Sequence, residues 1–118
     1  MVTIRNLIGF PLTVAGVSIP AEGVRASIPV PASPAPLTGI STNYGDIPIG
    51  VDFLASATLK DVVMSDGSEF PEARDSVIIL APLPVRNAAL RSGRTDVWGM
   101  GDRVSLTNPD AGVKYLVW

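Results

Sequence analysis

The chain has 118 residues, of which 47% are hydrophobic and 17% charged, and its net charge is −2 at pH 7. This length predicts a single domain. Histidine and cysteine are both absent, which excludes Ser-His-Asp and Cys-His catalysis, disulfides, and zinc sites built from those ligands. An enzyme would depend on carboxylates, Lys, Arg, Tyr or Ser alone, so we expect no enzymatic activity and no cofactor.

The charged residues form no block of one sign. We therefore expect no nucleic-acid partner, which would need a basic footprint. The longest apolar run, Val77–Leu83, is far shorter than the roughly 18 residues that span a bilayer. No continuous apolar segment of the signal-peptide kind follows the N-terminus, so we expect neither a membrane partner nor secretion through a signal peptide. The apolar excess must then be buried in a core or in a protein interface.

Eleven Pro and eleven Gly divide the chain into short β-prone runs. This spacing is typical of all-β proteins. It predicts one all-β domain over residues 1–118. The expected form is a small β-sandwich or barrel of about seven to nine short antiparallel strands, with one short α-helix at about residues 84–92.

The N-terminal third predicts strands and tight turns. Val2–Ile8 is β-prone, and Leu12–Ile19 reads as a hairpin that turns at Ala15-Gly16. Val24–Val30 alternates apolar and polar residues, which predicts a strand with one buried face. Because Pro29 cannot donate to a sheet ladder, that strand should end or lie at an edge there.

A proline-rich segment at about residues 29–36 follows this strand. Its sequence favours an extended, polyproline-like backbone. It is either a strap or arm that reaches a neighbouring molecule, or an ordinary solvated loop. In the first case Pro31, Pro34 and Pro36 would be interface residues. Beyond it, turn residues dominate up to Gly50, with a short strand at Ile40–Tyr44.

The middle of the chain is ambiguous. Val51–Leu59 fits both a helical stripe and a strand face, and the strand has fewer misfits, so we expect a strand. Met64–Asp75 should be a loop, with Asp66-Gly67 and Pro71 as turn signals. Its acidic residues do not have EF-hand spacing, so no metal site is predicted.

The C-terminal part holds the strongest signals. Val77–Leu80 is a continuous apolar run, typical of a strand buried on both faces. Pro84 suits the first turn of a helix and Gly93 its C-terminal end, and Val97-Trp98 resumes extended structure. A final hairpin is expected from Arg103–Thr107 and Val113–Trp118.

Two groups of side chains are candidate sites. Arg86, Arg91 and Arg94 could form an anion pocket, because arginine binds phosphate through two parallel hydrogen bonds. The alternative is that these arginines cap the helix end, with Arg94 paired to Asp96. Trp98, Tyr115 and Trp118 are either core residues or interface anchors.

Several short motifs resemble small, mostly uncharacterised proteins of tailed phages and prophages: Ile4–Leu7 with Pro11, Ile19–Arg25, Val77–Leu80, Val85–Ala89 and Arg94–Val97. The resemblance covers about two thirds of the chain. The chain departs from the pattern at Gly9-Phe10 and at Phe70-Pro71, and Pro31–Pro36 resembles an insertion. The resemblance implies a phage setting and little chemistry.

These observations predict a non-enzymatic phage structural or accessory protein. The leading expectation is a capsid decoration (cement) protein or another virion component that acts through oligomeric interfaces. Its partners would be further copies of itself, the major capsid protein, or both, and it would be found in the virion or the host cytoplasm. The alternative is a phage counter-defence protein that binds a nucleotide or another small anion through Arg86, Arg91 and Arg94.

Overall fold

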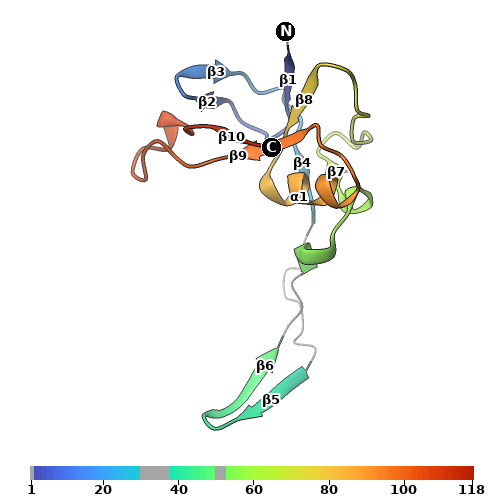
Figure 1. Cartoon of the computed structure of the whole chain (residues 1–118), viewed down its shortest axis with the longest axis vertical. Coiled ribbons are helices and arrows are strands. Elements are labelled where there is room, and N and C mark those ends of the chain that lie inside the picture. The colour runs from blue at the N-terminus through green and yellow to red at the C-terminus, as the bar shows by residue number, and fades with distance from the viewer. Residues whose placement is uncertain (1, 30–37, 50–52) are drawn as a thin grey trace.

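The computed structural model describes residues 2–29, 38–49 and 53–118, and these form a body and an arm. The body holds both chain ends, and the arm is a two-stranded hairpin that projects away from it (Figure 1). The principal extents are 57, 35 and 24 Å. In the described part of the chain, no helix is long and apolar enough to cross a membrane.

The body is built on a four-stranded sheet in the order β1-β8-β9-β10. Its strands are β1 (Thr3–Asn6), β8 (Val77–Leu80), β9 (Val97–Met100) and β10 (Leu116–Val117). β8 runs parallel to both β1 and β9, and only β10 is antiparallel to its neighbour. Residues 79 and 80 of β8 are completely buried. This confirms the prediction from its continuous apolar run.

Helix α1 (Leu83–Arg91) makes the crossover between the parallel strands β8 and β9. The predicted helix at about residues 84–92 is confirmed, with its bounds shifted by one residue. It begins after Pro82 and carries a proline in its first turn, where a missing N–H leaves no hydrogen bond unmade. Its buried residues are Val85, Ala88 and Ala89, and their small side chains let the helix lie close to the sheet.

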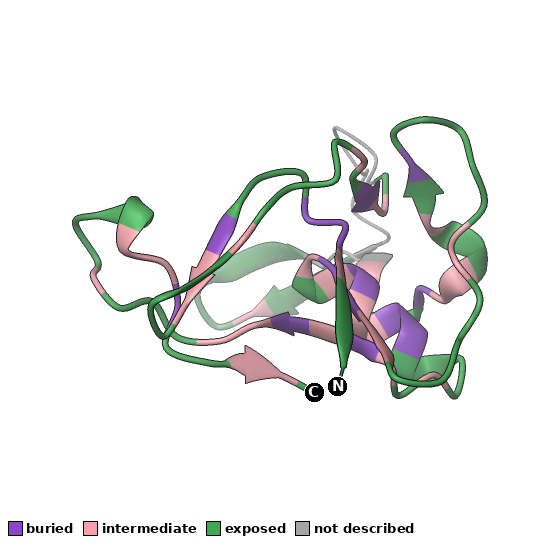
Figure 2. Ribbon diagram, turned by 90° about the horizontal axis from the view of Figure 1, so that it is seen from above, coloured by how far each residue is buried: buried purple, intermediate pink, exposed green. Residues whose placement is uncertain are grey.

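Two clusters of buried side chains form the core, and Figure 2 shows the buried residues gathered in the helix and the strands around it. The larger cluster joins α1, β8 and β9 to the paired strands β4 (Ala26–Ser27) and β7 (Val63–Met64). It consists of Leu7, Ala26, Met64, Ile79, Ala81, Val85, Ala89 and Val97. The smaller cluster consists of Ile8, Leu12, Leu80 and Val113. The central strand β8 supplies residues to both, so it is the architectural centre of the body.

Two short antiparallel pairs complete the body. β2 (Leu12–Val14) and β3 (Val17–Ile19) form the predicted hairpin, with positive φ angles at the turn residues 15 and 16. β4 (Ala26–Ser27) pairs with β7 (Val63–Met64). The strand predicted at Val24–Val30 is therefore present only in its centre, and its last residue lies outside the described residues.

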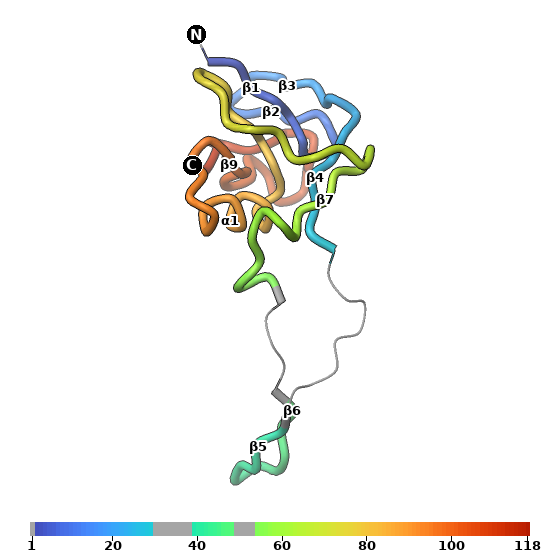
Figure 3. The backbone as a smooth tube through the Cα atoms, turned by 90° about the vertical axis from the view of Figure 1, so that its right-hand side faces the viewer, coloured from blue at the N-terminus to red at the C-terminus, as the bar shows by residue number. Residues whose placement is uncertain are grey.

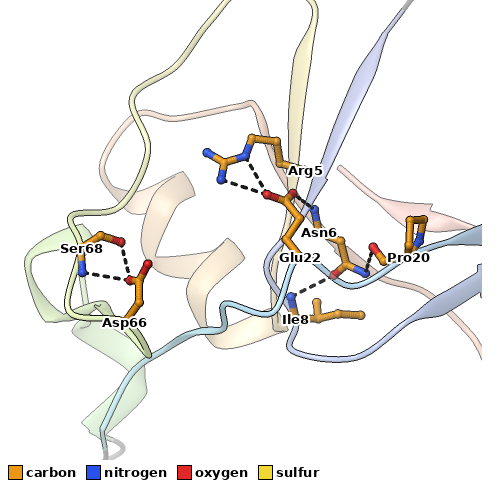
Figure 4. A network of polar contacts seen from close by, with 7 residues as sticks. All are labelled: Arg5, Asn6, Ile8, Pro20, Glu22, Asp66 and Ser68. Atoms are coloured by element: carbon orange, nitrogen blue, oxygen red, sulfur yellow. Dashed lines mark hydrogen bonds and ion pairs between the residues drawn. The ribbon is translucent and has the colours of Figure 1, made fainter.

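A buried polar network ties β1 to the segment before β4 (Figure 4). Asn6 has no exposed surface. Its Nδ2 donates to the carbonyl oxygens of Phe10 and Pro20, at 3.0 and 3.2 Å, and its Oδ1 accepts from the Ile8 amide at 3.1 Å. The backbone N–H of Asn6 donates to the Glu22 carboxylate at 2.7 Å, and this carboxylate also forms an ion pair with Arg5. Asn6 therefore satisfies backbone groups that the turns leave unpaired.

The arm consists of β5 (Thr38–Thr42) and β6 (Gly45–Ile49), which pair in antiparallel register. It is inserted between the paired strands β4 and β7, so the chain leaves and re-enters the body at neighbouring points (Figure 3). The sequence predicted a strand at Ile40–Tyr44 but not the returning strand. Among the proline positions singled out for an arm, Pro31, Pro34 and Pro36 lie outside the described residues.

The architecture corrects the predicted fold class in part. The protein is β-rich with one α-helix, as expected, but none of its small sheets in the described residues closes into a barrel. The expectation of antiparallel strands is wrong for the central sheet, where two of the three strand pairs are parallel. For β8 and β9 the reason is α1, because a helical crossover returns the chain in the same direction.

The prediction of a strand over Val51–Leu59 is also wrong. Two 3₁₀ helices, η1 (Phe53–Ser56) and η2 (Leu59–Asp61), occupy its described part. The Asp61 carboxylate accepts a hydrogen bond from the Thr58 amide at 2.9 Å, which stabilises the start of η2. This local capping removes the amide from any strand ladder.

The predicted C-terminal hairpin forms with its first strand shifted toward the N-terminus. β10 pairs antiparallel with β9, and a bridge between Arg103 and Val113 continues the same register. The Lys114 amide also donates to the Asp102 carbonyl oxygen at 2.7 Å. The connection contains the 3₁₀ helix η3 (Pro109–Ala111), which the Asn108 side chain caps. The apolar residues near the C-terminus therefore complete the central sheet as the second strand of this hairpin.

Candidate functional site

The three arginines that the sequence singled out lie on α1 or just after it, but they do not form one cluster. The exposed Arg91 turns toward the 3₁₀ region. Its Nε donates to the carbonyl oxygen of Ala57 at 2.6 Å and its Nη2 to that of Leu54 at 2.7 Å. Arg91 therefore holds the end of η1 against the helix, which is a structural contact.

Arg94 forms a two-point ion pair with Asp96. Its Nε and Nη2 donate to the two carboxylate oxygens at 2.7 and 2.8 Å, and Nη2 also donates to the Pro71 carbonyl oxygen at 3.1 Å. The guanidinium carbon lies 5.6 Å from the centre of the Phe70 ring. Hydrogen bonding to Asp96 raises the pKa of Arg94, and the same bonds lower the pKa of Asp96. The pairing proposed from the sequence is present.

Arg86 is placed differently again. Its Nη1 donates to the Asn87 side chain at 3.1 Å, and its Nη2 makes a short hydrogen bond to the Trp118 carbonyl oxygen. Arg86 therefore links α1 to the end of the described chain. Of the three arginines, Arg86 and Arg94 share a cavity, whereas Arg91 does not line it.

This cavity, here called the socket, has a volume of about 220 Å³ and is lined by Arg86, Leu90, Arg94, Thr95, Val97 and Trp118. Its walls are mainly hydrocarbon and aromatic surface, and none of the described residues that line it is acidic. Leu90 is 49% exposed and Trp118 is 79% exposed. An apolar hollow bordered by arginines suits an aromatic or aliphatic group that carries a negative charge nearby.

The aromatic residues predicted as core residues or interface anchors differ in their exposure to solvent. Trp98 is half-buried and its ring nitrogen donates to the Thr95 carbonyl oxygen at 3.2 Å. Its ring centre lies 6.5 Å from that of Trp118, with the planes tilted by 48°. Tyr115 is half-exposed, and its hydrogen bond to Asp102 raises its pKa. Trp118 therefore has an aromatic neighbour on one side and solvent on the other.

The loop between β7 and β8 is bordered by two open clefts of about 560 and 600 Å³. Within the loop, the Asp66 carboxylate accepts hydrogen bonds from the Ser68 hydroxyl at 2.6 Å and its amide at 3.0 Å, which lower the pKa of Asp66. These bonds form a local turn (Figure 4). The described residues contain no group of three or more acidic side chains placed to hold a metal ion.

The most exposed candidate surface is one that the sequence did not single out, the arm. Tyr44, in its turn, is 90% exposed, and the cross-strand neighbours Ile40 and Ile47 are each 47% exposed. The opposite face carries Asp46, whose carboxylate accepts a 2.8 Å hydrogen bond from Ser41. In the sequence, Ile40 precedes the turn residues Asn43-Tyr44-Gly45, and Ile47 and Ile49 follow them at alternate positions. This pattern is typical of a hairpin with one apolar face and could have predicted the arm.

The Arg94–Asp96 pair predicts a pH dependence of stability. Because the folded pKa of Asp96 is lowered, the pair stabilises the fold above the unfolded value of about 3.9 and loses this effect as the pH falls through the folded pKa. Asp96→Asn should therefore lower the free energy of unfolding by about 1–2 kcal/mol at pH 7. The difference from the parent should shrink below pH 4.

Urea unfolding from pH 7 to pH 2.5 measures this difference. The control is Asp75→Asn, which removes the same charge from an exposed position. A loss for Asp96→Asn that stays constant over the whole range would contradict the assigned role of the pair.

Comparison with known proteins adds no assignment. No family model matches the chain, and searches of curated proteins and of solved structures find no match either.

Proposed function

We propose that this protein is a non-enzymatic assembly component that acts through protein–protein interfaces. A phage head decoration protein, or a related virion accessory protein, is the form of this role that the sequence motifs favour. The observation that carries the proposal is the arm, a hairpin whose apolar residues Ile40, Ile47 and Tyr44 are left exposed.

An isolated two-stranded hairpin is marginally stable in water at best. The arm is nevertheless a regular hairpin with its register set over five residue pairs, from Thr38 with Ile49 to Thr42 with Gly45. Its apolar residues gain little from burial within its own chain, because Figures 1 and 3 show it extended away from the body. Burial against another protein would supply the missing stabilisation, at about 25 cal/mol for each Å² of apolar surface.

The body offers complementary surface. Leu83 and Leu90 on α1 are 47% and 49% exposed, and Trp118 is 79% exposed. Stable interfaces bury roughly 800 Å² on each partner, which is more than one short hairpin provides. Several weak arm contacts made at once would hold a lattice or ring together through avidity.

Removing the arm tests this function. We expect the full chain to form concentration-dependent oligomers, or to bind phage heads, in sedimentation experiments. A variant with residues 38–49 replaced by a short Gly-Ser linker should lose this association. Its body should stay folded, because the core clusters contain no arm residue.

Circular dichroism and the melting temperature of the deletion variant provide the control for folding. A full-length chain that stays monomeric at its highest soluble concentration, and that does not bind heads, would contradict the proposed function. Equal association with and without the arm would assign the interface to the body instead.

Binding of a small anion is the second candidate, and the presence of Arg86 and Arg94 at one socket is the observation that favours it. The contacts already made by the arginines weigh against it, since Asp96 neutralises Arg94 and Arg91 faces backbone carbonyls. Thermal unfolding with and without AMP separates the candidates. A rise in melting temperature that Arg86→Ala abolishes would favour the anion-binding function.

A further inference from the structure

The arm presents a single aromatic side chain at its tip. Tyr44 lies in the turn between β5 and β6, and its side chain is 90% exposed. The turn is held in shape, because the Thr42 hydroxyl donates to the Gly45 carbonyl oxygen at 2.8 Å and accepts from the Tyr44 amide at 3.1 Å. An aromatic ring on a pre-ordered turn loses little conformational entropy on binding.

The socket beside α1 has the chemistry that such a ring requires. Leu90, Val97 and Trp118 provide apolar and aromatic walls, and Arg86 and Arg94 lie among them. Arginine favours the face of an aromatic ring, and Tyr, Trp and Arg are the residue types enriched at the energetic centres of interfaces. The socket lies on the body, and the arm that carries Tyr44 points away from that body (Figure 3).

We propose that Tyr44 of one copy of this chain inserts into the socket of a second copy. This inference rests on the proposed assembly function and names its partner and contact. Charge complementarity favours a second copy as the occupant. Asp46 lies two residues after Tyr44 and is the only charged residue among the described residues of the arm. Its counterpart at the socket is Arg86, whose hydrogen bonds go to the Asn87 side chain and to the Trp118 carbonyl oxygen, whereas Arg94 is already paired with Asp96.

The apolar face of the arm also matches an apolar surface on the body, the outer face of α1. Ile40 and Ile47 form a cross-strand pair on one face, and the outer face of α1 exposes Leu83 and Leu90. Two leucines seven positions apart lie on the same side of a helix. With Tyr44 in the socket beside Leu90, the isoleucine pair can cover this stripe of α1.

The contact joins two different surfaces, the arm tip of one copy and the socket of another. Such a heterologous contact closes into a ring or continues as an open chain, unless two copies exchange arms reciprocally and form a two-fold dimer. Each copy therefore both donates a tyrosine and receives one.

Disulfide trapping tests the contact directly, because the chain contains no cysteine. Asn43→Cys, beside Tyr44 in the arm turn, and Thr95→Cys, in the lining of the socket, leave Tyr44 and Leu90 in place. The two proteins are prepared separately, mixed and oxidised mildly. We expect a disulfide-linked pair that contains one copy of each. The matched control mixes Asn43→Cys with Val17→Cys, a 64% exposed position on β3, and should give little of the mixed pair.

Sedimentation of two further variants completes the experiment. Tyr44→Ser removes the inserted ring and Leu90→Lys places a charge in the socket, so each should weaken self-association by about tenfold or more. A mixture of the two variants should form a mixed dimer, since one intact tip and one intact socket remain.

The outcomes separate the two proposals. If the parent chain associates while neither variant weakens it and the mixed disulfide is absent, the tip-to-socket contact is overturned and the assembly function stands. Disulfides that form mainly between two Asn43→Cys copies would assign the contact to paired arm tips and would also overturn it. A parent chain that remains monomeric at every concentration overturns the tip-to-socket contact, and it overturns the assembly function as well if the chain also fails to bind phage heads.

Discussion

Replacing Asn6 with Asp should lower the free energy of unfolding by about 3–5 kcal/mol at pH 7. The Asn6 side chain is completely buried, and its Nδ2 donates to the carbonyl oxygens of Phe10 and Pro20. An aspartate in the same place would turn a carboxylate oxygen toward two carbonyl oxygens. It would lose both hydrogen bonds and leave a buried charge with the Ile8 backbone amide as the one donor retained from the network.

Urea unfolding of the two proteins at pH 7 measures this loss. Asn43→Asp is the matched control, because it makes the same change at an exposed position in the arm turn and should alter stability by less than about 0.5 kcal/mol. Part of the loss in Asn6→Asp should return in acid, where the buried carboxyl group is protonated and can donate one hydrogen bond. A loss below about 1 kcal/mol at pH 7 would show that the network of Figure 4 contributes little.

Replacing Gly112 with Ala should lower the free energy of unfolding by about 2–4 kcal/mol, through two separate effects. Gly112 has a φ angle of +78°, which is unfavourable for a residue with a side chain. A Cβ atom at this position would also overlap the carbonyl oxygen of Thr13. That oxygen accepts a 2.9 Å hydrogen bond from the Val113 amide, and this bond joins β2 to the C-terminal segment.

Gly67→Ala separates these two effects. Gly67 has the same φ angle of +78°, but a Cβ atom there would meet nothing within 4 Å. It should therefore show the backbone strain alone, about 1 kcal/mol. Thermal and urea unfolding of both variants measure the difference, which reports the close approach of Gly112 to Thr13 together with the cost of the Gly112 ψ angle of −151°, a backbone region adopted almost only by glycine. Equal losses in the two variants would mean that the C-terminal segment moves away from β2 without loss of stability.

Elements with local signals were predictable from the sequence. Val77–Leu80 is a strand because a continuous run of apolar residues, most of them β-branched, favours extended structure buried on both faces. Helix α1 follows from a proline in its first turn, small residues on its inner face and a glycine beyond its end. The hairpin at Leu12–Ile19 follows from apolar residues on both sides of a two-residue turn. In each case the determining residues are neighbours in the chain.

The candidate sites were only partly predictable. The sequence identified Arg86, Arg94 and Trp118 as residues of interest, and the structure brings these three to one socket. It does not bring Arg91 to that socket, because the carbonyl oxygens of Leu54 and Ala57 bind the Arg91 guanidinium group. No sequence pattern indicates which carbonyl groups of a distant segment a helix-end arginine will reach.

The sequence by itself determined that the chain is β-rich with one helix and that it has neither histidine nor cysteine chemistry. It also determined that hydrophobic residues far outnumber charged ones. Only the tertiary structure decided which strands are neighbours. β8 runs parallel to β1, which lies far away in the sequence, and the C-terminal hairpin takes β9 as its first strand, where Arg103–Thr107 was predicted. The physical reason is that strand pairing depends on long-range burial and on the α1 crossover, whereas propensity reports only local backbone preference. The same reason applies to the arm, since its exposed tyrosine and the distant socket that suits it become visible only once the chain is folded.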